Sequence, residues 1–267
     1  DEDIGRVDLD FYHWLKKNYN EFKRKSSKEK IRLYIENGAH IEDGVTIGEN
    51  SIIISPQIIV NKGAKISKES YVECEEKFVL GALSYFGPNL EIINRQTIIG
   101  MQIYAGHEIY IGGGGCKDPW AVLVIGDDCF LGEELSINTA RPVVIGEEVM
   151  VTMRSVIMTH NIGHSPLEGF ENRFAPVILE DRTIVGINST VYAGVRIGKE
   201  SIIGSNSYVV SNIPKNKMAI GVPAKVINDS SKKLTDDQKE KLVLKIIYDF
   251  KILLKEKGYE ISNHKDI

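Results

Sequence analysis

Two histidines, His160 and His164, stand four residues apart in a segment, 158–169, that also contains glycine, asparagine and proline. An imidazole titrates near neutral pH, so it can take the proton of an attacking hydroxyl group as a general base. Such help lowers a reaction barrier by roughly 3–5 kcal/mol, which is about 10²–10⁴-fold in rate. The alternative is a pair of loop histidines exposed to water, and the surrounding elements decide between these two interpretations.

A six-residue repeat follows the histidine segment. From Leu179 to Pro214 the sequence divides into six blocks of six, and each block opens on an aliphatic residue. The openers are Leu179, Val185, Val191, Ile197, Ile203 and Val209. This period fits neither the two-residue period of a strand nor the 3.6-residue period of a helix. It predicts a solenoid in which short parallel strands meet at bends and the openers stack inward.

Weaker repeats extend the pattern toward the N-terminus. The earlier openers form six trios with a step of about six residues: Ile41, Ile47 and Ile53; Val60, Ile66 and Val72; Val79, Phe86 and Ile92; Ile99, Ala105 and Ile111; Ile125, Leu131 and Ile137; and Ile145, Val151 and Ile157. With the clean run they predict eight coils. At the usual strand separation these coils would form about 38 Å of solenoid.

The longest steps in the repeat follow the third opener of a coil. The step is fourteen residues after Ile111, eight after Ile137 and twenty-two after Ile157. We therefore expect three loops at one corner of three neighbouring coils, with the histidines in the largest. Loops on one edge of a rigid scaffold are where binding and chemistry usually lie.

The blocks at 185–190, 197–202 and 203–208, with the exit segment 220–227, resemble the hexapeptide-repeat acyltransferases. The resemblance implies an all-β fold, a left-handed parallel β-helix of triangular section with three hexapeptides in each coil. The usual rule for parallel crossovers would predict the opposite hand, so the hand rests on the resemblance.

The expected organisation has three parts: a helical cap at 1–34, the β-helix at 35–228 with an active-site loop at 158–176, and a helical segment at 229–267. Apolar residues at helical spacing from Leu9 to Phe22 predict a helix that covers the first coil, because a solenoid otherwise exposes an edge strand. A second helix should begin at a capping box, Thr235 with Gln238, and end at Gly258. We expect it to cover the last coil or a neighbouring subunit, or to bind a partner.

The loop at 158–176 resembles the active-site loop of sugar and antibiotic O-acetyltransferases in this family. The resemblance implies that a loop histidine is the catalytic base. His160 is favoured because it stands closer to the rigid strand, and His164 remains the alternative. Glu168, Glu171 or a backbone carbonyl could orient the imidazole.

The expected acceptor-binding residues come from the loops of the two preceding coils. Asn138 and Arg141 follow Ile137 at the corner below His160, so they should lie near the base. Trp120 lies in the loop before that. It could stack on the face of a sugar ring or serve as a packed anchor of its loop.

The resemblance also implies acetyl-CoA as the donor, with its pantetheine arm in the groove between neighbouring prisms. The positions of this chain that match are Gly186, Ile187, Gly204, Ser205, Val210 and Ser211. Many relatives have Thr-Lys at 210–211, so Lys215, Lys217 or Lys225 would have to supply the missing phosphate contact.

The prediction is therefore an acetyl-CoA-dependent acetyltransferase that forms a homotrimer and acetylates a hydroxyl group of a sugar or saccharide. The alternative is an N-acetyltransferase that acts on a nucleotide-linked amino sugar, which would need a nucleotide pocket in the first coils. A non-catalytic trimeric scaffold is a further alternative.

A zinc carbonic anhydrase on the same fold would need three converging histidines. The next histidine upstream of His160 is His107, at a distance of 53 residues, which is not a whole number of 18-residue coils. No metal site is expected.

The composition restricts the partners and the compartment. A net charge of -4 and a pI near 5.9 argue against nucleic acid or an anionic membrane as a partner. Cys74, Cys116 and Cys129 form no CxxC pair, and Cys129 falls on an inward position of the repeat. A reducing, cytoplasmic location is expected.

Overall fold

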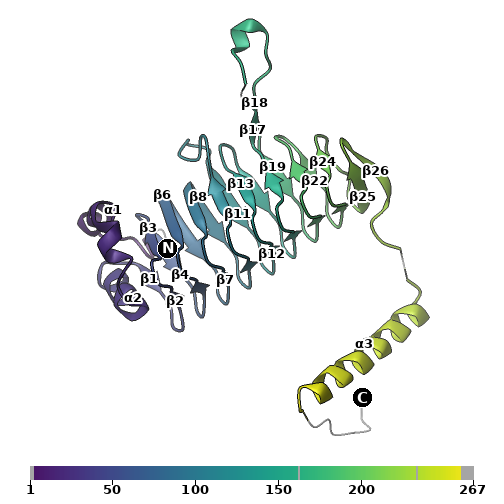
Figure 1. The fold of residues 1–267 in the computed structure, drawn as a ribbon, viewed down its shortest axis with the longest axis horizontal. Helices are drawn as coiled ribbons and strands as arrows, with labels where there is room; N and C mark the ends of the chain where they lie inside the picture. Colours follow the sequence, from purple (N-terminus) through teal and green to yellow (C-terminus); the bar gives the residue numbers. More distant parts are fainter. Residues whose placement is uncertain (1–2, 162, 233, 260–267) are drawn as a thin grey trace. The chain divides into compact units, whose positions relative to one another are not determined.

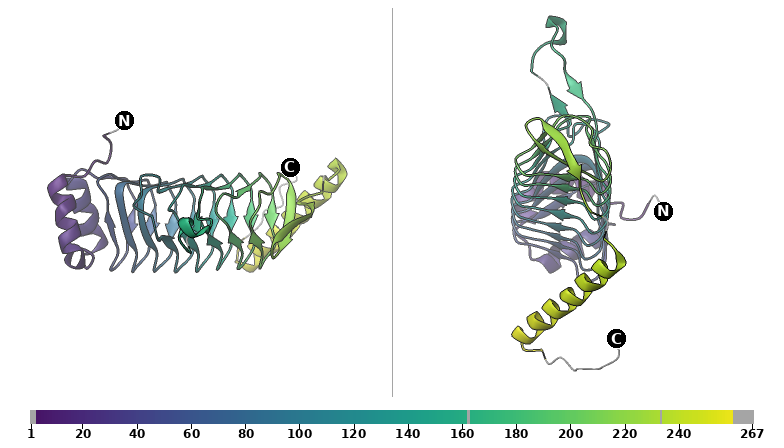
Figure 2. Two further views of the ribbon diagram at one scale, coloured as in Figure 1. Left: turned by 90° about the horizontal axis from the view of Figure 1, so that it is seen from above. Right: turned by 90° about the vertical axis from the view of Figure 1, so that its right-hand side faces the viewer.

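The computed structural model describes residues 3–161, 163–232 and 234–259. The chain divides into two units, with the boundary between Ser230 and Ser231. The first unit is the expected left-handed parallel β-helix, a row of stacked coils with three faces (Figures 1 and 2). Corresponding strands of successive coils pair in parallel along the row, as Ile111 pairs with Ile137 and Ile137 with Ile157.

Each face takes one strand from every coil. Face A consists of β1 (His40–Ile41), β4 (Ile58–Val60), the second halves of β6 (Tyr71–Leu80) and β8 (Glu91–Ile99), β11 (Val122–Ile125), β14 (Val143–Ile145), β19 (Val177–Leu179) and β22 (Arg196–Ile197). Face B consists of β2 (Thr46–Ile47), β5 (Lys65–Ile66), β7 (Tyr85–Phe86), β9 (Tyr104–Ala105), β12 (Phe130–Leu131), β15 (Met150–Val151), β20 (Ile184–Val185), β23 (Ile202–Ile203) and β25 (Lys217–Gly221). Face C consists of β3 (Ile52–Ile54), the first halves of β6 and β8, β10 (Tyr110–Gly112), β13 (Ser136–Asn138), β16 (Val156–Ile157), β21 (Thr190–Val191) and β24 (Tyr208–Val209).

The openers of the repeat form the core. On face B every opener from Ile47 to Ile203 is at most 2% exposed, and full burial of such a side chain stabilises the fold by about 1.5–3 kcal/mol. One expected opener was wrong. In the third coil the inward residue is Leu80, which is buried, and not Val79, which is half-buried, because the pairing register of β6 shifts between Cys74 and Lys77.

The β-helix ends in a partial ninth turn that the repeat count omitted. Ile213 bridges to Ile197, and β25 pairs with β23 on face B. The strand β26 (Ala224–Asp229) then folds back antiparallel on β25. This hairpin covers the edge that a parallel ladder would otherwise leave unpaired.

Small side chains fill the corners of the coils. The Sγ atom of Cys129 lies 3.0 Å from the carbonyl oxygen of Gly146, as Ser84 Oγ lies 3.0 Å from that of Gly100. Cys129 is 2% exposed, which confirms its expected inward position. A thiol here replaces a serine that bonds the next coil.

Two helices cover the first coil, where one was expected. The helix α1 (Leu9–Phe22) has the predicted bounds, and α2 (Ser27–Glu36) follows it. The buried hydroxyl of Tyr34 in α2 donates to the carbonyl oxygen of Ile53 at 2.7 Å and accepts from the amide of the same residue at 2.9 Å. The cap thus satisfies backbone groups of the terminal strand.

The second unit contains α3 (Asp236–Glu256). Thr235 and Gln238 form the predicted capping box, and the helix stops just before Gly258. None of the described residues of α3 is buried. Within the described residues, no helix combines the length and the apolar composition that a membrane span requires.

Three loops leave the β-helix at one corner, as the repeat steps predicted. They follow β10, β13 and β16 on face C and lead to β11, β14 and β19 on face A, so we name this edge the C–A corner. The longest loop rises from the prism (Figure 1) as an antiparallel pair, β17 (His160–Asn161) and β18 (Arg173–Phe174), and carries a short 3-10 helix, η1 (Pro166–Glu168).

Candidate functional site

The C–A corner brings together residues from three successive coils. Asn138 lies at the end of β13, His160 follows β16, and the glycine-rich start of the 113–121 loop follows β10. The pairing of β13 with both β10 and β16 stacks these segments one strand separation apart. The strands of the β-helix therefore support the site rigidly, although two of its parts are loops.

The side chain of Asn138 is held in one orientation. Its Nδ2 atom donates to the carbonyl oxygens of Gly112 at 3.0 Å and Gly114 at 3.3 Å. Its Oδ1 atom accepts from the hydroxyl of Thr159 at 2.5 Å and lies 2.8 Å from Nδ1 of His160. An amide that must present its NH₂ group to two carbonyls presents its oxygen to the opposite side.

This orientation fixes the tautomer of His160. Because Asn138 Oδ1 can only accept a hydrogen bond, Nδ1 of His160 must carry the proton. The Nε2 atom of the neutral ring then has a free lone pair. Nε2 is the atom that can act as a base, and the contact between Nδ1 and Asn138 fixes the ring that carries it.

Gly114 of the glycine-rich segment faces the ring of His160. A Cβ atom at Gly114 would lie 3.7 Å from Nε2 and 3.8 Å from Cε1 of His160. Gly113 and Gly115 have φ values of 88° and 82°, which side chains disfavour. Of the four glycines at 112–115, Gly114 is the one that faces the imidazole, while Gly113 and Gly115 pack against Asn138 and Ala140.

Aromatic and cationic side chains form a wall beside the histidine. The ring of Phe174 stacks on that of His160 at a centroid distance of 5.6 Å. The guanidinium of Arg141 lies 4.6 Å from the ring of Phe174 and 4.8 Å from that of Trp120, and its Nη1 lies 3.4 Å from Asp118 Oδ2. Trp120 is 58% exposed, so its free face is open to a ligand.

The sequence pointed to Trp120, Asn138, Arg141 and His160 as neighbours, and the structure places all four together. The sequence did not point to Phe174. Phe174 reaches the site because it pairs with His160 across the loop hairpin. The only sign of this in the sequence is an aromatic residue near the end of the loop.

His164 lies away from this cluster. It is exposed in the outer part of the loop and its ring contacts Phe170 at 4.5 Å. Glu168 and Glu171 are also exposed, and in the described part of the loop neither is hydrogen-bonded to His160. The group that contacts Nδ1 is Asn138, which had been expected only to bind the acceptor.

The expected donor-binding residues fall on different edges of the prism. Gly186, Ile187, Gly204 and Ser205 follow β20 and β23 at the corner between faces B and C, the B–C corner. Val210 and Ser211 follow β24 at the C–A corner, Lys215 lies between faces A and B, Lys217 begins β25, and Lys225 lies in β26. A single copy of the chain therefore does not bring the first four residues to His160.

The glycines of the B–C corner also have a packing role. A Cβ atom at Gly186 would lie 2.5 Å from the amide nitrogen of Ser205, and one at Gly204 would lie 2.3 Å from Cγ2 of Ile220. The side chain of Ile187, next to Gly186 at the same corner, is 43% exposed. Close stacking of the coils alone thus explains why glycine occupies these two positions.

The cysteines offer no reactive thiolate to this site. All three are free, and burial raises the pKa of Cys74 to about 12 and that of Cys129 to about 11. Among the described residues, no three histidine, cysteine, aspartate or glutamate side chains are grouped so that they could hold a metal ion.

Comparisons with known proteins agree with this fold. Residues 176–211 match the family model described as bacterial transferase hexapeptide (six repeats), and residues 122–157 match the hexapeptide repeat of succinyl-transferase. A Saccharomyces cerevisiae protein named "Putative acetyltransferase YJL218W" is 30% identical over 175 residues, which cover 65% of this chain and 74% of that protein.

Two further similarities cover different shares of the chain. A 2,3,4,5-tetrahydropyridine-2,6-dicarboxylate N-acetyltransferase of Staphylococcus aureus is 38% identical over 66 residues, and the match spans 25% of this chain and 27% of that relative. The solved structure of a mutant of AntD, an N-acyltransferase from Bacillus cereus, covers 71% of this chain and 91% of its own, with 16% identity and a TM-score of 0.46.

Proposed function

This chain belongs to the hexapeptide-repeat acyltransferase family, and we propose that it transfers an acetyl group from acetyl-CoA to a hydroxyl group of a saccharide. The observation that carries the proposal is the contact between His160 Nδ1 and Asn138 Oδ1 at 2.8 Å. It leaves Nε2 unprotonated beside Gly114, where the absence of a side chain lets a hydroxyl group approach.

The chemistry of the step follows from this arrangement. The acceptor oxygen attacks the carbonyl carbon of the thioester while its proton passes to Nε2 of His160. The carbon–sulfur bond then breaks, the acetyl group stays on the acceptor, and the proton goes from the imidazolium to the departing thiolate of CoA. His160 is restored, so no covalent enzyme intermediate is needed.

The wall beside the base supports a saccharide as the acceptor. Sugar rings present apolar C–H faces and polar hydroxyl edges. The exposed ring of Trp120 offers a stacking surface, and Arg141 lies between Trp120 and Phe174 with N–H groups that can donate to hydroxyl oxygens.

The outward faces of the prism support a homotrimer. Face A presents an aliphatic stripe and face B an aromatic and aliphatic one, whereas polar side chains such as Glu91, Ser136 and Thr190 interrupt the outward row of face C, which also holds Tyr110 and Val156. The stripe on face A consists of Ile59, Val79, Ile98, Val124, Val144 and Ile178, and that on face B of Tyr85, Tyr104, Phe130, Met150, Ile184 and Ile202. Face A of one copy can bury its stripe on face B of the next, and three such contacts close a ring.

This assembly would complete the site. If faces A and B meet around a three-fold axis, the C–A corner of one copy lies beside the B–C corner of the next. His160 of one copy then faces Gly186, Ile187, Gly204 and Ser205 of its neighbour across a groove. The donor-binding residues and the base, which are separated in one copy, would share one groove in the trimer.

The test is an acceptor panel with acetyl-CoA. Thiol release would be followed with neutral sugars, amino sugars, nucleotide-linked amino sugars and water, and the product would be identified by NMR. We expect turnover with a sugar hydroxyl and an ester product. Amide products alone, with no ester from any sugar, would contradict the proposal and support the N-acetyltransferase alternative.

A further inference from the structure

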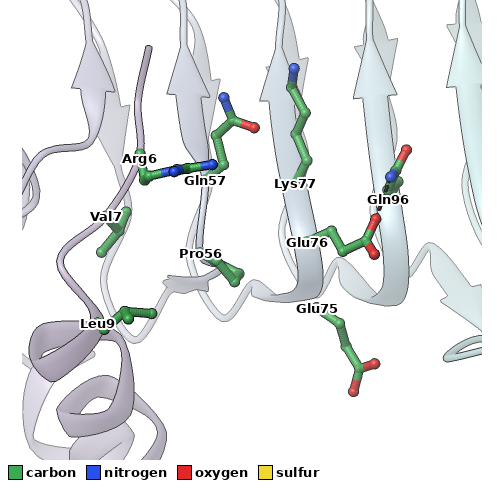
Figure 3. A pocket seen from close by; sticks show the side chains of 9 residues that line it. All are labelled: Arg6, Val7, Leu9, Pro56, Gln57, Glu75, Glu76, Lys77 and Gln96. Atoms are coloured by element: carbon green, nitrogen blue, oxygen red, sulfur yellow. Dashed lines mark hydrogen bonds between the residues drawn. The ribbon is translucent and has the colours of Figure 1, made fainter. Parts of the chain in front are cut away.

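A cavity of 490 Å³ lies at the C–A corner, in coils that precede those of His160. Figure 3 shows the side chains that line it. It opens where the segment before α1 meets the beginning of face A. Arg6 extends from that segment toward Gln57, and Lys77 and Gln96 stand on the next two strands. The remaining lining residues are Val7, Leu9, Pro56, Glu75 and Glu76.

The loop that carries Trp120 joins this cavity to the acyl-transfer site. The backbone N–H of Gln96 donates to the carbonyl oxygen of Ala121, the residue after Trp120, at 3.2 Å. In the same loop Lys117 Nζ lies 3.6 Å from Glu75 Oε1. Three strand separations lie between Gln96 and His160, through the pairs β8–β10, β10–β13 and β13–β16, or roughly 14 Å along the prism.

The charges of the cavity are balanced, which favours a neutral ligand. Most charged groups of the cavity already have an ion-pair partner: Arg6 lies 3.3 Å from Asp3 and Glu75 lies 3.6 Å from Lys117. Glu76 is paired with Arg95 and hydrogen-bonded to Gln96. A phosphate group would have to compete with these carboxylates for the cations, which costs free energy. A ring with many hydroxyl groups, in contrast, can donate to the carboxylates and accept from the ammonium and amide groups.

The cavity also has an apolar side. Val7 is buried, and Leu9 and Pro56 complete that wall. Hydrogen-bonding groups on one side and an apolar surface on the other match the edge and the face of a sugar ring. Its volume is in the range of ordinary small-ligand sites.

We propose that this cavity is a distal subsite for a sugar unit remote from the reacting one, so that the acceptor is an oligosaccharide lying along the C–A corner from the cavity to His160. The inference rests on the proposed function. It adds the substrate class: a neutral chain of several sugar units in place of a monosaccharide or a nucleotide-linked sugar. The donor would approach the base from the other end of the groove, past Gly186 and Gly204 of the neighbouring copy.

The experiment compares acceptors of increasing length. Initial rates with acetyl-CoA would be measured for glucose to maltotetraose, for N-acetylglucosamine to chitotetraose, and for UDP-N-acetylglucosamine. In at least one ladder, kcat/KM should rise at least about 10-fold from the monosaccharide to the tetrasaccharide, as one or two added hydrogen bonds would give. Lys77→Met should bring this ratio toward one.

Lys28→Met, on the exposed surface of α2, is the matched control and should leave the ratio unchanged. If the protein acetylates monosaccharides and kcat/KM does not change with acceptor length in either series, the subsite is overturned and the proposed function stands. A Lys77→Met effect confined to the nucleotide-linked sugar would also overturn it, in favour of a nucleotide. Absence of transfer to every saccharide would overturn the proposed function, and the subsite with it.

Discussion

Asn138 Oδ1 lies 2.8 Å from Nδ1 of His160, and the two side chains come from successive coils at one corner of the β-helix. The carbonyl oxygens of Gly112 and Gly114 fix the asparagine, and the asparagine fixes the imidazole. We assign Asn138 the role of a positioning residue, because it acts through His160 and does not contact the reacting atoms.

Replacement of Asn138 should therefore change the pH profile as well as the rate. Asn138→Ala removes the acceptor for Nδ1–H and should lower kcat/KM by about 10–100-fold, the range known for partners that orient a metal-ligating histidine. Asn138→Asp would place a carboxylate beside the ring and stabilise the imidazolium. The acidic limb of the kcat/KM profile should then move to higher pH.

Asn18→Ala, in α1, is the control for these two variants. A loss of activity in Asn138→Asp without any movement of the acidic limb would show that Asn138 only supports the local structure.

The proposed groove between copies predicts complementation between two inactive variants. His160→Ala lacks the base, and Ser205→Trp should block the donor side of the groove. After unfolding together and reassembly in equal amounts, about a quarter of the contacts in random trimers would pair two intact sides. Activity should recover to about that fraction of the unaltered protein.

The control mixes His160→Ala with Asn138→Ala, which damage the same corner. This mixture should not recover activity. Equal behaviour of the two mixtures would mean that the base and the donor site belong to one copy.

Lys30 predicts a pH dependence of stability. Burial lowers the pKa of its ammonium to about 8, partly opposed by Glu49, while its Nζ donates to the carbonyl oxygen of Gly48 at 2.7 Å. Above pH 8 the folded state releases this proton and the unfolded state keeps it, so the contribution of Lys30 to the free energy of unfolding should rise with pH, by at most about 3 kcal/mol. Burial also raises the pKa of Cys74, Cys129, Tyr34 and Tyr71, and these groups lower stability above about pH 8.5 for the thiols and about pH 10 for the phenols. The effect of Lys30 is therefore the difference between the unaltered protein and Lys30→Met.

The useful window is therefore about pH 7.5–9.5. Denaturant unfolding at a fixed protein concentration should show that the unaltered protein gains stability relative to Lys30→Met as the pH rises through this window. Gly48 O still accepts from the amide of Ser51 at 3.3 Å in that variant. Parallel curves for the two proteins would assign the pH dependence to other groups.

The repeat made much of the fold predictable. A buried aliphatic residue every six positions is a local constraint, and it determined the coils, the common corner of the three loops and the proximity of Asn138 to His160. The exceptions are places where pairing between distant residues decides the structure. The register shift after Cys74 placed Leu80 inward, and the hairpin of the long loop brought Phe174 to the histidine.

The role of Asn138 could not be predicted for a related reason. The sequence placed it one coil below the base, but the direction of its amide depends on two carbonyl groups in the coil below that one. The second helix of the cap was missed because its apolar positions are few, and only Lys30 and Tyr34 are buried in it.

The central claim is that Nε2 of His160, oriented by Asn138, is the base of acetyl transfer. The most direct measurement is the initial rate of thiol release from acetyl-CoA, with a saccharide acceptor, for the unaltered protein, His160→Ala and His164→Ala. His160→Ala should lower kcat by about 10²–10⁴-fold. His164→Ala should stay within about threefold of the unaltered rate, because this residue lies in the exposed part of the loop. A large loss in His164→Ala with near-normal rates in His160→Ala would contradict the account.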